Sequence, residues 1–447
     1  MRQHRLRGAA DVLTARYRRF LRLPDTAALL AVALVARMPI GMLSLALLMH
    51  LRALVGSFAT AGAIVGGYLV ASALVAPILG RTVDRRGLTG VLLLTGTVQP
   101  SALLLILLAD PLGLPVVAIA ALAIVAGALA PPISVLTRTL WRHRFDEGEL
   151  RRTAFAVDAV LVEINFTVGP ALVALFLAVA TPAVAFGVAV LFTAIAAPLF
   201  LNSPAPRYWR REVAGARTRF LGPLGERRLL HVYAISITLA FVFGLLEVGY
   251  PGFATRAGMP AVGGILIAIN SIGSAAGGIA YGGLALRAPV ERQLPWMLAV
   301  LALPIALHAL VASPWILALP AIVAGLLVAP SLSAVSMLVA THAPARHATE
   351  AFTWQMTSIV SGVGAGMAVG GWLVDRHGPA ATFLLAAASA LTGALLASRL
   401  RHGSPPTFTV PVDASALDTT KAPSTMAASD ESSRQRSGQP PLTRTRE

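Results

Sequence analysis

The sequence predicts an all-α polytopic membrane protein of about twelve transmembrane helices in two six-helix bundles. Three observations predict it: an apolar composition, apolar segments of membrane-crossing length, and an arginine-rich segment at the centre of the chain. Hydrophobic residues make up 56% of the 447 residues and charged residues only 13%, and the mean hydropathy is +0.74. Such a composition is typical of chains built from membrane spans rather than around a water-soluble core.

Apolar segments of about 20 residues, the length that crosses a bilayer as a helix, recur along the chain. The residues at which we expect spans to begin are Thr26, Phe58, Leu88, Leu114, Thr153, Pro182, Leu229, Ala261, Leu294, Pro314, Thr349 and Pro379. Arginines gather in alternate connections and in both terminal segments. By the positive-inside rule, this alternation predicts an even number of spans in the cell (inner or plasma) membrane, with both termini in the cytoplasm.

The chain is expected to divide into five parts. Residues 1–25 form an Arg-rich cytoplasmic arm on anionic lipid, 26–201 the first six-helix bundle, 202–228 a cytoplasmic linker, 229–400 the second bundle, and 401–447 a disordered cytoplasmic tail. The linker is marked by prolines and arginines, and the tail by Pro, Ser, Thr and Arg with few aromatic residues.

An internal repeat supports the division into two bundles, because small and basic residues recur at nearly the same separation. The matching sets are Gly80 and Arg85 with Gly282 and Arg287, Gly127 and Pro132 with Gly325 and Pro330, Gly169 with Gly366, and Phe186 with Phe383. Parallel repeats of this kind predict two halves related by an axis normal to the membrane.

Several classes of function are excluded by what the sequence lacks. The formal net charge of +16 arises from arginines that follow the topology, so we expect no nucleic-acid partner. The chain contains no cysteine, which removes thiol catalysis and thiolate metal sites. It also shows no phosphate-binding loop, no metal-ligand cluster and no nucleophile in a catalytic setting, so we expect neither an enzyme nor a cofactor or metal.

Two opposite charges lie deep in the first bundle. Arg37 is about eleven residues into the first span and Glu163 about ten into the fifth, which places both ~15 Å deep in a ~30 Å core. We expect them to meet, and Pro39 and Gly41 to loosen the helix beside Arg37. Glu163 would then be a proton-coupling group, or Arg37 would receive an anionic substrate when the pair opens; a permanent structural ion pair is the alternative.

Other polar residues of the spans are candidates for proton coupling or substrate binding. Asp158 is near the cytoplasmic start of the fifth span, where the helix dipole favours a carboxylate, with a functional role as the alternative. Glu247 precedes Gly249 to Gly252, where we expect the helix to break, and so belongs to an outer gate or a headgroup-level interface. Three further residues are candidates for lining a cavity or for ordinary helix packing: Gln99, Trp354 and Gln355.

A polar segment, Gly80 to Gly87, joins the second and third spans. Gly80 is expected to let helix ends approach, Asp84 to accept from a helix N-terminus, Arg85 to stay in water or at headgroups, and Gly87 to permit a left-handed exit. Arg138, near the end of the fourth span, can pair with Asp84 or extend to the headgroups. A segment of the same spacing, residues 371–378, follows the eleventh span, where the predicted topology places it outside.

The order Gly, three residues, Asp-Arg, one residue, Gly between these spans resembles the loop between helices 2 and 3 of the major facilitator superfamily. Thr82 departs from that pattern, because the position is usually apolar. Gly169-Pro170 is similar to the glycine-proline feature of the fifth helix in the superfamily's bacterial proton-coupled exporters. The resemblance implies two bundles that rock about a central cavity. It also implies a gating role for Gly80, Asp84, Arg85, Gly87 and Arg138.

From these features we expect a secondary active transporter that exports a small hydrophobic or amphipathic compound in exchange for protons, by alternating access. Few polar groups in the spans favour an apolar cargo. Proton-coupled uptake of a small metabolite is the alternative, and a membrane sensor or scaffold without transport is a hypothesis of a different class. The expected partners are a small-molecule substrate, protons and membrane lipid.

Overall fold

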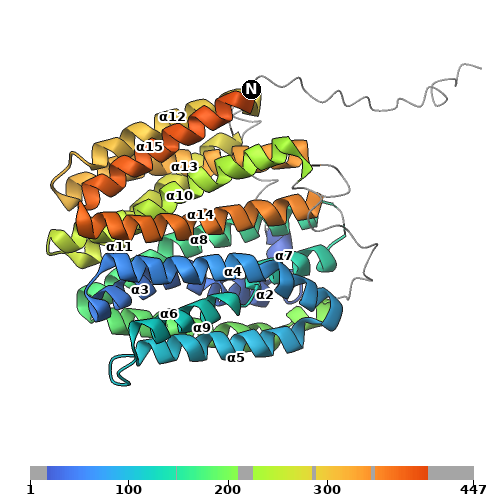
Figure 1. The fold of residues 1–447 in the computed structure, drawn as a ribbon. Helices are drawn as coiled ribbons and strands as arrows, with labels where there is room; N and C mark the ends of the chain where they lie inside the picture. Colours follow the sequence, from blue (N-terminus) through green and yellow to red (C-terminus); the bar gives the residue numbers. More distant parts are fainter. Residues whose placement is uncertain (1–17, 147, 210–224, 284–287, 344–347, 401–447) are drawn as a thin grey trace, which may run out of the picture. The chain divides into compact units, whose positions relative to one another are not determined.

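The computed structural model describes residues 18–146, 148–209, 225–283, 288–343 and 348–400, and within them the regular structure is helical, with no strand (Figure 1). The Arg-rich arm up to residue 17, the arginine-rich part of the linker (210–224) and the predicted disordered tail lie outside the described residues.

Twelve stretches of helix in the described chain are long and apolar enough to cross a membrane, which confirms the fold class. The helices of the first half are α2 (Thr26–Ala36), α3 (Met38–Val55), α4 (Phe58–Arg86), α5 (Leu88–Leu107), α6 (Val116–Ala128), α7 (Ile133–Arg144), α8 (Glu149–Val179) and α9 (Pro182–Leu201), followed by the short helix η1 (Ala205–Tyr208). Those of the second half are α10 (Arg227–Arg256), α11 (Pro260–Gly283), α12 (Val290–His308), α13 (Pro314–His342), α14 (Ala348–Arg376) and α15 (Pro379–Arg399).

The first and fourth spans are each built from two helices. The first joins α2 to α3 through Arg37, and the fourth joins α6 to α7 through residues 129–132. The starts expected from the sequence agree closely with the helices, and the largest differences are four residues, where α8 begins at Glu149 against Thr153 and α12 at Val290 against Leu294. Hydropathy and length were therefore sufficient to locate the spans.

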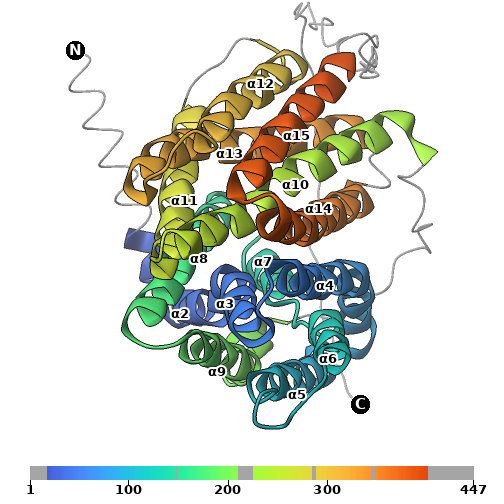
Figure 2. The same ribbon diagram turned by 60° about the vertical axis from the view of Figure 1, so that its left-hand side comes forward.

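The helices of each half pack mainly on one another, and two helix pairs make most of the contacts between the halves. Helix α4 lies beside α14, and α8 lies beside α11, in both views (Figures 1 and 2). We call these two contacts the seam. The same compact unit, residues 1–402, contains both halves, and one core cluster of the first half includes Val248, Met367 and Val374 from the second.

The same glycine-mediated helix crossings occur in each half. A Cβ on Gly169 of α8 would meet the backbone of Gly41 on α3, and one on Gly366 of α14 would meet the backbone of Phe241 and Gly244 on α10. Similarly, Gly127 packs on Tyr68 between α6 and α4, and Gly325 packs on Asn270 between α13 and α11. Small residues at these positions allow helix backbones to approach closely, as in other membrane bundles.

Glycines also bring the halves together along the seam, toward one end of the bundle. Added Cβ atoms on Gly62 and Gly66 of α4 would meet the carbonyls of Met367 and Gly364 on α14, and one on Gly264 of α11 would meet Pro170 on α8. These residues lie toward the end of the bundle at which Ser57 of the first half contacts Asp375 of the second. We call this end the latch end. We call the opposite end, which contains Arg86, Arg144 and Arg228, the arginine end.

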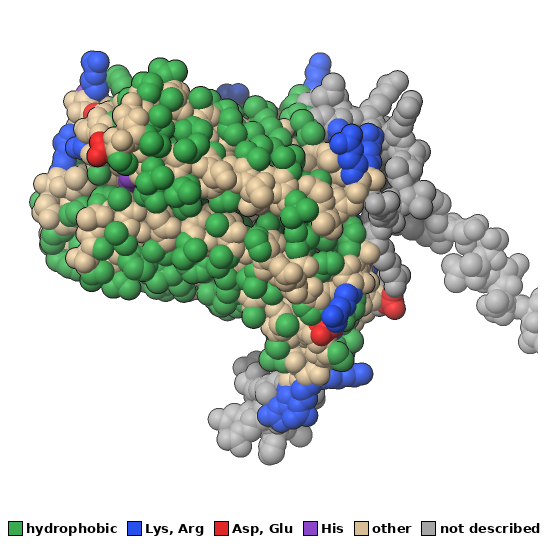
Figure 3. Space-filling view, turned by 90° about the horizontal axis from the view of Figure 1, so that it is seen from below, with side chains coloured by type: hydrophobic (Ala, Val, Ile, Leu, Met, Phe, Trp, Pro, Cys, Tyr) green, Lys and Arg blue, Asp and Glu red, His purple; other side chains and the backbone are tan. Residues whose placement is uncertain are grey.

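The surface has the distribution expected of a protein in lipid. In one face of the molecule, hydrophobic side chains cover most of the middle, and Lys and Arg side chains lie toward the ends (Figure 3). Large apolar side chains are exposed on α12 and α13, with Trp296 at 68% and Leu319 at 69%. Exposure of this extent is unfavourable in water and natural in a bilayer.

Candidate functional site

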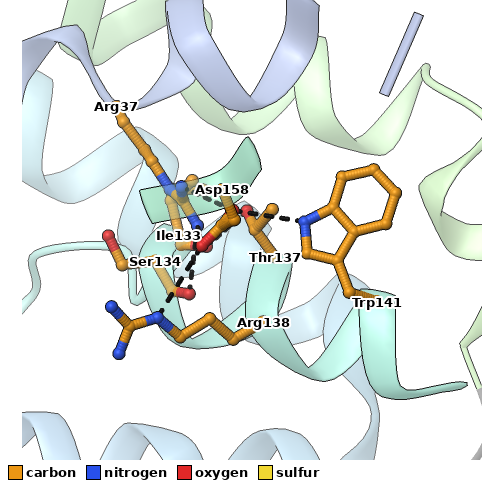
Figure 4. A network of polar contacts seen from close by, with 7 residues as sticks. All are labelled: Arg37, Ile133, Ser134, Thr137, Arg138, Trp141 and Asp158. Atoms are coloured by element: carbon orange, nitrogen blue, oxygen red, sulfur yellow. Dashed lines mark hydrogen bonds and ion pairs between the residues drawn. The ribbon is translucent and has the colours of Figure 1, made fainter. Parts of the chain in front are cut away.

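The most deeply buried charges form an ion pair between Arg37 and Asp158. Arg37 Nη1 donates to Asp158 Oδ1 at 2.8 Å and Nη2 to Oδ2 at 3.3 Å, and both residues are almost fully buried. Trp141 Nε1 also donates to Oδ1, at 3.2 Å, and Arg37 Nη2 approaches the Ser134 carbonyl (Figure 4). The charges thus compensate each other inside the first half, as buried charges must.

The broken helices of the first half position this network. Arg37 lies between α2 and α3, with Pro39 at the start of α3, so the helix of the first span is interrupted at its arginine. Ser134 and Trp141 lie on α7, which begins after the interruption of the fourth span by Pro131 and Pro132. The loosening of the first span beside Arg37 was predicted from Pro39, whereas the matching break in the fourth span was not.

The prediction that Arg37 meets Glu163 was wrong in the choice of partner. Asp158 and Glu163 are five residues apart on α8, so their side chains leave the helix about 140° apart. Asp158 faces α2 and α7, and Glu163 therefore lies on a different side of α8. Asp158 also lies about 7.5 Å nearer the arginine end of α8 than Glu163, so the predicted match in depth was off by more than one helical turn, in addition to the direction of the side chain around the helix.

Glu163 lies on the face of α8 that forms the seam. Pro170 and Ala174 are seven and eleven residues further along, close to two and three full turns, so the three residues share one face. Gly264 of α11 packs against both Pro170 and Ala174. Glu163 is half-buried near the midpoint of α8, and no hydrogen bond or ion pair joins it to another described residue. It is an uncompensated carboxyl group directed toward the other half.

Glu247 lies where α10 meets the first half. Its helix contacts α3 and α4, and the Ser44 side chain of α3 lies close to the carboxylate. Glu247 Oε2 is buried without a hydrogen-bond partner among the described residues. The expected helix break after Glu247 was wrong, because α10 continues through Pro251 to Arg256. Glu247 therefore belongs to the contact between the halves and not to a broken helix end.

Helix α10 tolerates its proline because glycines let neighbours pack closely around it. Gly263 of α11 packs on Pro251, Gly249 on Phe383 and Gly252 on Val374. The buried Tyr250 hydroxyl donates to His308 Nε2 at 3.0 Å. This packing holds the helix together beyond the proline.

The remaining polar candidates make contacts within one half. Gln99 Nε2 donates to the Tyr68 hydroxyl at 3.1 Å, and Gln355 Nε2 donates to Ser336 Oγ at 3.0 Å. Trp354 is half-buried against the core of the second half. These contacts are those expected of helix packing, the second of the two interpretations given for these residues.

The segment Gly80 to Gly87 is helical almost to its end. Helix α4 extends through Arg86, and Gly87, with φ +90°, is the single residue between α4 and α5. The positive φ at Gly87 was predicted, whereas the close helix approach at Gly80 was not found, since an added Cβ there would meet nothing within 4 Å. Arg85 is exposed, as predicted, and the side chain of Asp84 is outside the described part of the chain.

Arg138 has a neighbour that neither interpretation anticipated. Its Nε lies 3.7 Å from Asp158 Oδ2, while 59% of the side chain is exposed (Figure 4). An exposed pair at this distance is weak, so Arg138 adds little to the Arg37–Asp158 pair.

The second copy of the motif, after the eleventh span, forms a contact across the seam. Asp375 Oδ2, on the last turn of α14, accepts from Ser57 Oγ at 2.7 Å and from the Ala59 backbone N–H at 2.8 Å. These groups belong to the start of α4, where free N–H groups and the helix dipole favour a negative charge. We call this contact the latch; the sequence drew attention to Asp375, but not to Ser57.

Together, the fold and these charges define a multi-pass α-helical membrane protein with two homologous-looking halves joined along a seam. The family model described as Major Facilitator Superfamily matches residues 29–319 and 260–431, so the chain belongs to this superfamily of transmembrane transporters. The family and the fold are those of transporters of small molecules and not of enzymes.

Solved transporters share the fold at low sequence identity. A mutant form of the nucleoside transporter NupG superposes with a TM-score of 0.70 at 16% identity, covering 84% of this chain and 99% of that one. NupG itself gives 0.69 at 13%, covering 86% and 100%. The human organic anion transporter MFSD10 (TETRAN) gives 0.56 at 17%, covering 84% and 100%. No curated protein matches the sequence significantly.

Proposed function

We propose that this transporter exports a small hydrophobic or amphipathic compound across the cell membrane in exchange for protons, by alternating access. The observation that carries the proposal is Glu163, an uncompensated carboxyl group near the midpoint of a span on the face that meets the other half. A carboxyl group in that position changes the charge of the seam when it binds or releases a proton. Proton binding is thereby coupled to how the halves contact each other.

In this proposal the Arg37–Asp158 pair is a permanent ion pair that stabilises the first half and takes no part in proton coupling or substrate binding. Its charges compensate each other within the first half, and separating them would leave a buried charge without a partner. The pair fixes the broken first span against α7 and α8, while Glu163 remains free to titrate. Arg37 is accordingly not assigned to the substrate.

Alternating access requires contacts between the halves that can separate at one end while forming at the other. The latch and the glycine contacts of the seam support a state closed at the latch end. Because arginines concentrate at the other end, we assign the arginine end, with both termini, to the cytoplasm and the latch end to the outside. On this assignment the structure represents the conformation that is closed toward the outside, which is the inward-facing state of the transport cycle.

The test is accumulation of substrate in proteoliposomes with an imposed pH gradient. A panel of amphipathic amines, alcohols and carboxylates is supplied, and uptake is quantified by mass spectrometry. Wild type should concentrate its substrate, whereas Glu163→Gln should only equilibrate it, because the variant carries no proton. Glu226→Gln, an exposed carboxyl group at the start of α10, is the matched control and should behave as wild type.

Three results would contradict parts of the proposal. Normal gradient-driven accumulation by Glu163→Gln would remove Glu163 from coupling. Accumulation that requires proton flow in the same direction as substrate would replace export by proton-coupled uptake. Binding of panel compounds without any flux in wild type would favour the sensor or scaffold.

A further inference from the structure

We propose that Glu247, with Asn165 and Ser44, binds the positively charged group of the substrate, so that the cargo is an organic cation: a protonated amine with an apolar body. This inference rests on the proposed function, since it assigns the substrate class to the same transporter, at the contact of α10 with the first half. It separates two tasks: Glu163 carries the proton, and Glu247 binds the cargo.

The first observation is that Asn165 and Glu247 Oε2 are buried without a hydrogen-bond partner among the described residues and belong to residues that lie against one turn of α3. Asn165 is 1% exposed, and neither its Oδ1 nor its Nδ2 has a hydrogen-bond partner among the described residues. Its backbone packs on Gly41, and Glu247 of the other half lies next to Ser44. Gly41 and Ser44 are three residues apart and therefore neighbours on the α3 surface. Asn165 of α8 and Glu247 of α10 thus lie against the same turn of α3.

The second observation is the cost of leaving such groups unsatisfied. A buried amide or carboxylate without a hydrogen bond costs free energy, and native structures rarely contain such groups without a reason. Ordinary helix packing accounts for Gln99 and Gln355, which are hydrogen-bonded, but not for the Asn165 amide and Glu247 Oε2. A ligand that donates hydrogen bonds would satisfy Asn165 Oδ1 and Glu247 Oε2.

The third observation is the charge balance around Glu163 and Glu247. In the part of the chain that the structure describes, the basic residues of the inner spans have partners elsewhere: Arg37 and Arg138 face Asp158, and His50 and His308 bond to groups of their own halves. The other charged side chains on the helices packed against α8 and α10 lie near helix ends.

The charge balance selects the class of ligand. An anionic cargo would place its negative charge beside the Glu247 carboxyl group, with no cation there to compensate it among the described residues. A protonated amine instead supplies the missing positive charge and donates hydrogen bonds to a carboxylate, an amide oxygen and a hydroxyl. This chemistry separates the chain from an organic anion transporter, although the fold is shared.

The test uses three probes of one shape and different charge: 4-phenylbutylamine, 4-phenylbutan-1-ol and 4-phenylbutyrate. Their binding to purified protein in lipid nanodiscs is measured by calorimetry at pH 7, where the amine is protonated. Wild type should bind the amine at least tenfold more tightly than the alcohol or the acid. Glu247→Gln should lose at least tenfold in amine affinity and keep its alcohol affinity within about twofold; Glu247→Asp should recover part of the loss.

Four results would each overturn the assignment. Wild type could bind the three probes equally, bind the acid more tightly than the amine, or fail to bind the amine; or Glu247→Gln could lose amine and alcohol binding equally. Because binding is read without transport, these results leave the proton-coupling test on Glu163 intact. Conversely, a Glu163→Gln variant that transports normally but binds the amine tightly would refute the coupling and spare the cation site.

Discussion

The latch at Asp375 gives the sharpest mechanical prediction. Replacing Asp375 by Ala removes the acceptor for Ser57 Oγ and for the Ala59 N–H, and removes a negative charge from the start of α4. Ser57 still caps α4 in this variant, so the loss is that of a second acceptor for a free N–H, which by analogy with a cap costs about 1 kcal/mol, and of an exposed charge at a helix N-terminus, which contributes about 0.3–1 kcal/mol. The sum, about 1–2 kcal/mol, corresponds to a roughly 5- to 30-fold shift in population toward states open at the latch end. Asp375→Asn retains an acceptor oxygen and should shift the population only about twofold.

Double electron–electron resonance can measure this shift, and the chain contains no native cysteine to interfere with labelling. Labels at Ala53 and Ala380, both exposed at the latch end, report its opening. Asp375→Ala should increase the population of long distances, and a pair at Thr89 and Leu230 should shorten at the arginine end. Asp110→Asn, another exposed acid at the latch end, is the control. Unchanged distance distributions in Asp375→Ala would refute the latch.

Two further predictions concern the packing that supports the site. Asp158→Asn leaves Arg37 buried without its counter-charge and should destabilise the protein by about 3–5 kcal/mol, seen as a lower unfolding temperature in detergent; the double variant Arg37→Met, Asp158→Leu should recover most of the loss. Equal stability of the single variant and wild type would contradict the ion pair. Gly66→Leu places a side chain against the Gly364 carbonyl and should abolish transport while expression persists, whereas Gly90→Leu, in open space, should not. Full transport by Gly66→Leu would argue against closure through the seam.

The fold could be predicted from the sequence because membrane length and apolar composition act locally. Each span is recognised from its own residues, without knowledge of its neighbours, and hence the starts at Thr26, Phe58 and Pro314 coincide with the helices. Glycines repeated between the halves predicted equivalent elements, and the structure gives Gly169 and Gly366 equivalent crossings.

The site could be predicted only in part, because partners depend on the relative rotation of neighbouring helices. The sequence matched Arg37 in depth with Glu163, but its partner Asp158 lies five residues earlier on α8, which is about 7.5 Å along the helix and about 140° around it. Likewise, Asp375 was conspicuous in the sequence, yet its contact with Ser57 requires that α4 and α14 lie side by side. Pro251 predicted a helix break that the surrounding glycines made unnecessary.

The measurement that tests the central claim most directly is the internal pH of proteoliposomes when substrate is added, compared between wild type and Glu163→Gln. The account predicts that a substrate gradient drives protons in the opposite direction to substrate in wild type, and that the variant moves substrate down its gradient without any pH change. Substrate movement with no proton movement in either protein would contradict it, and would leave Glu163 a structural residue of the seam.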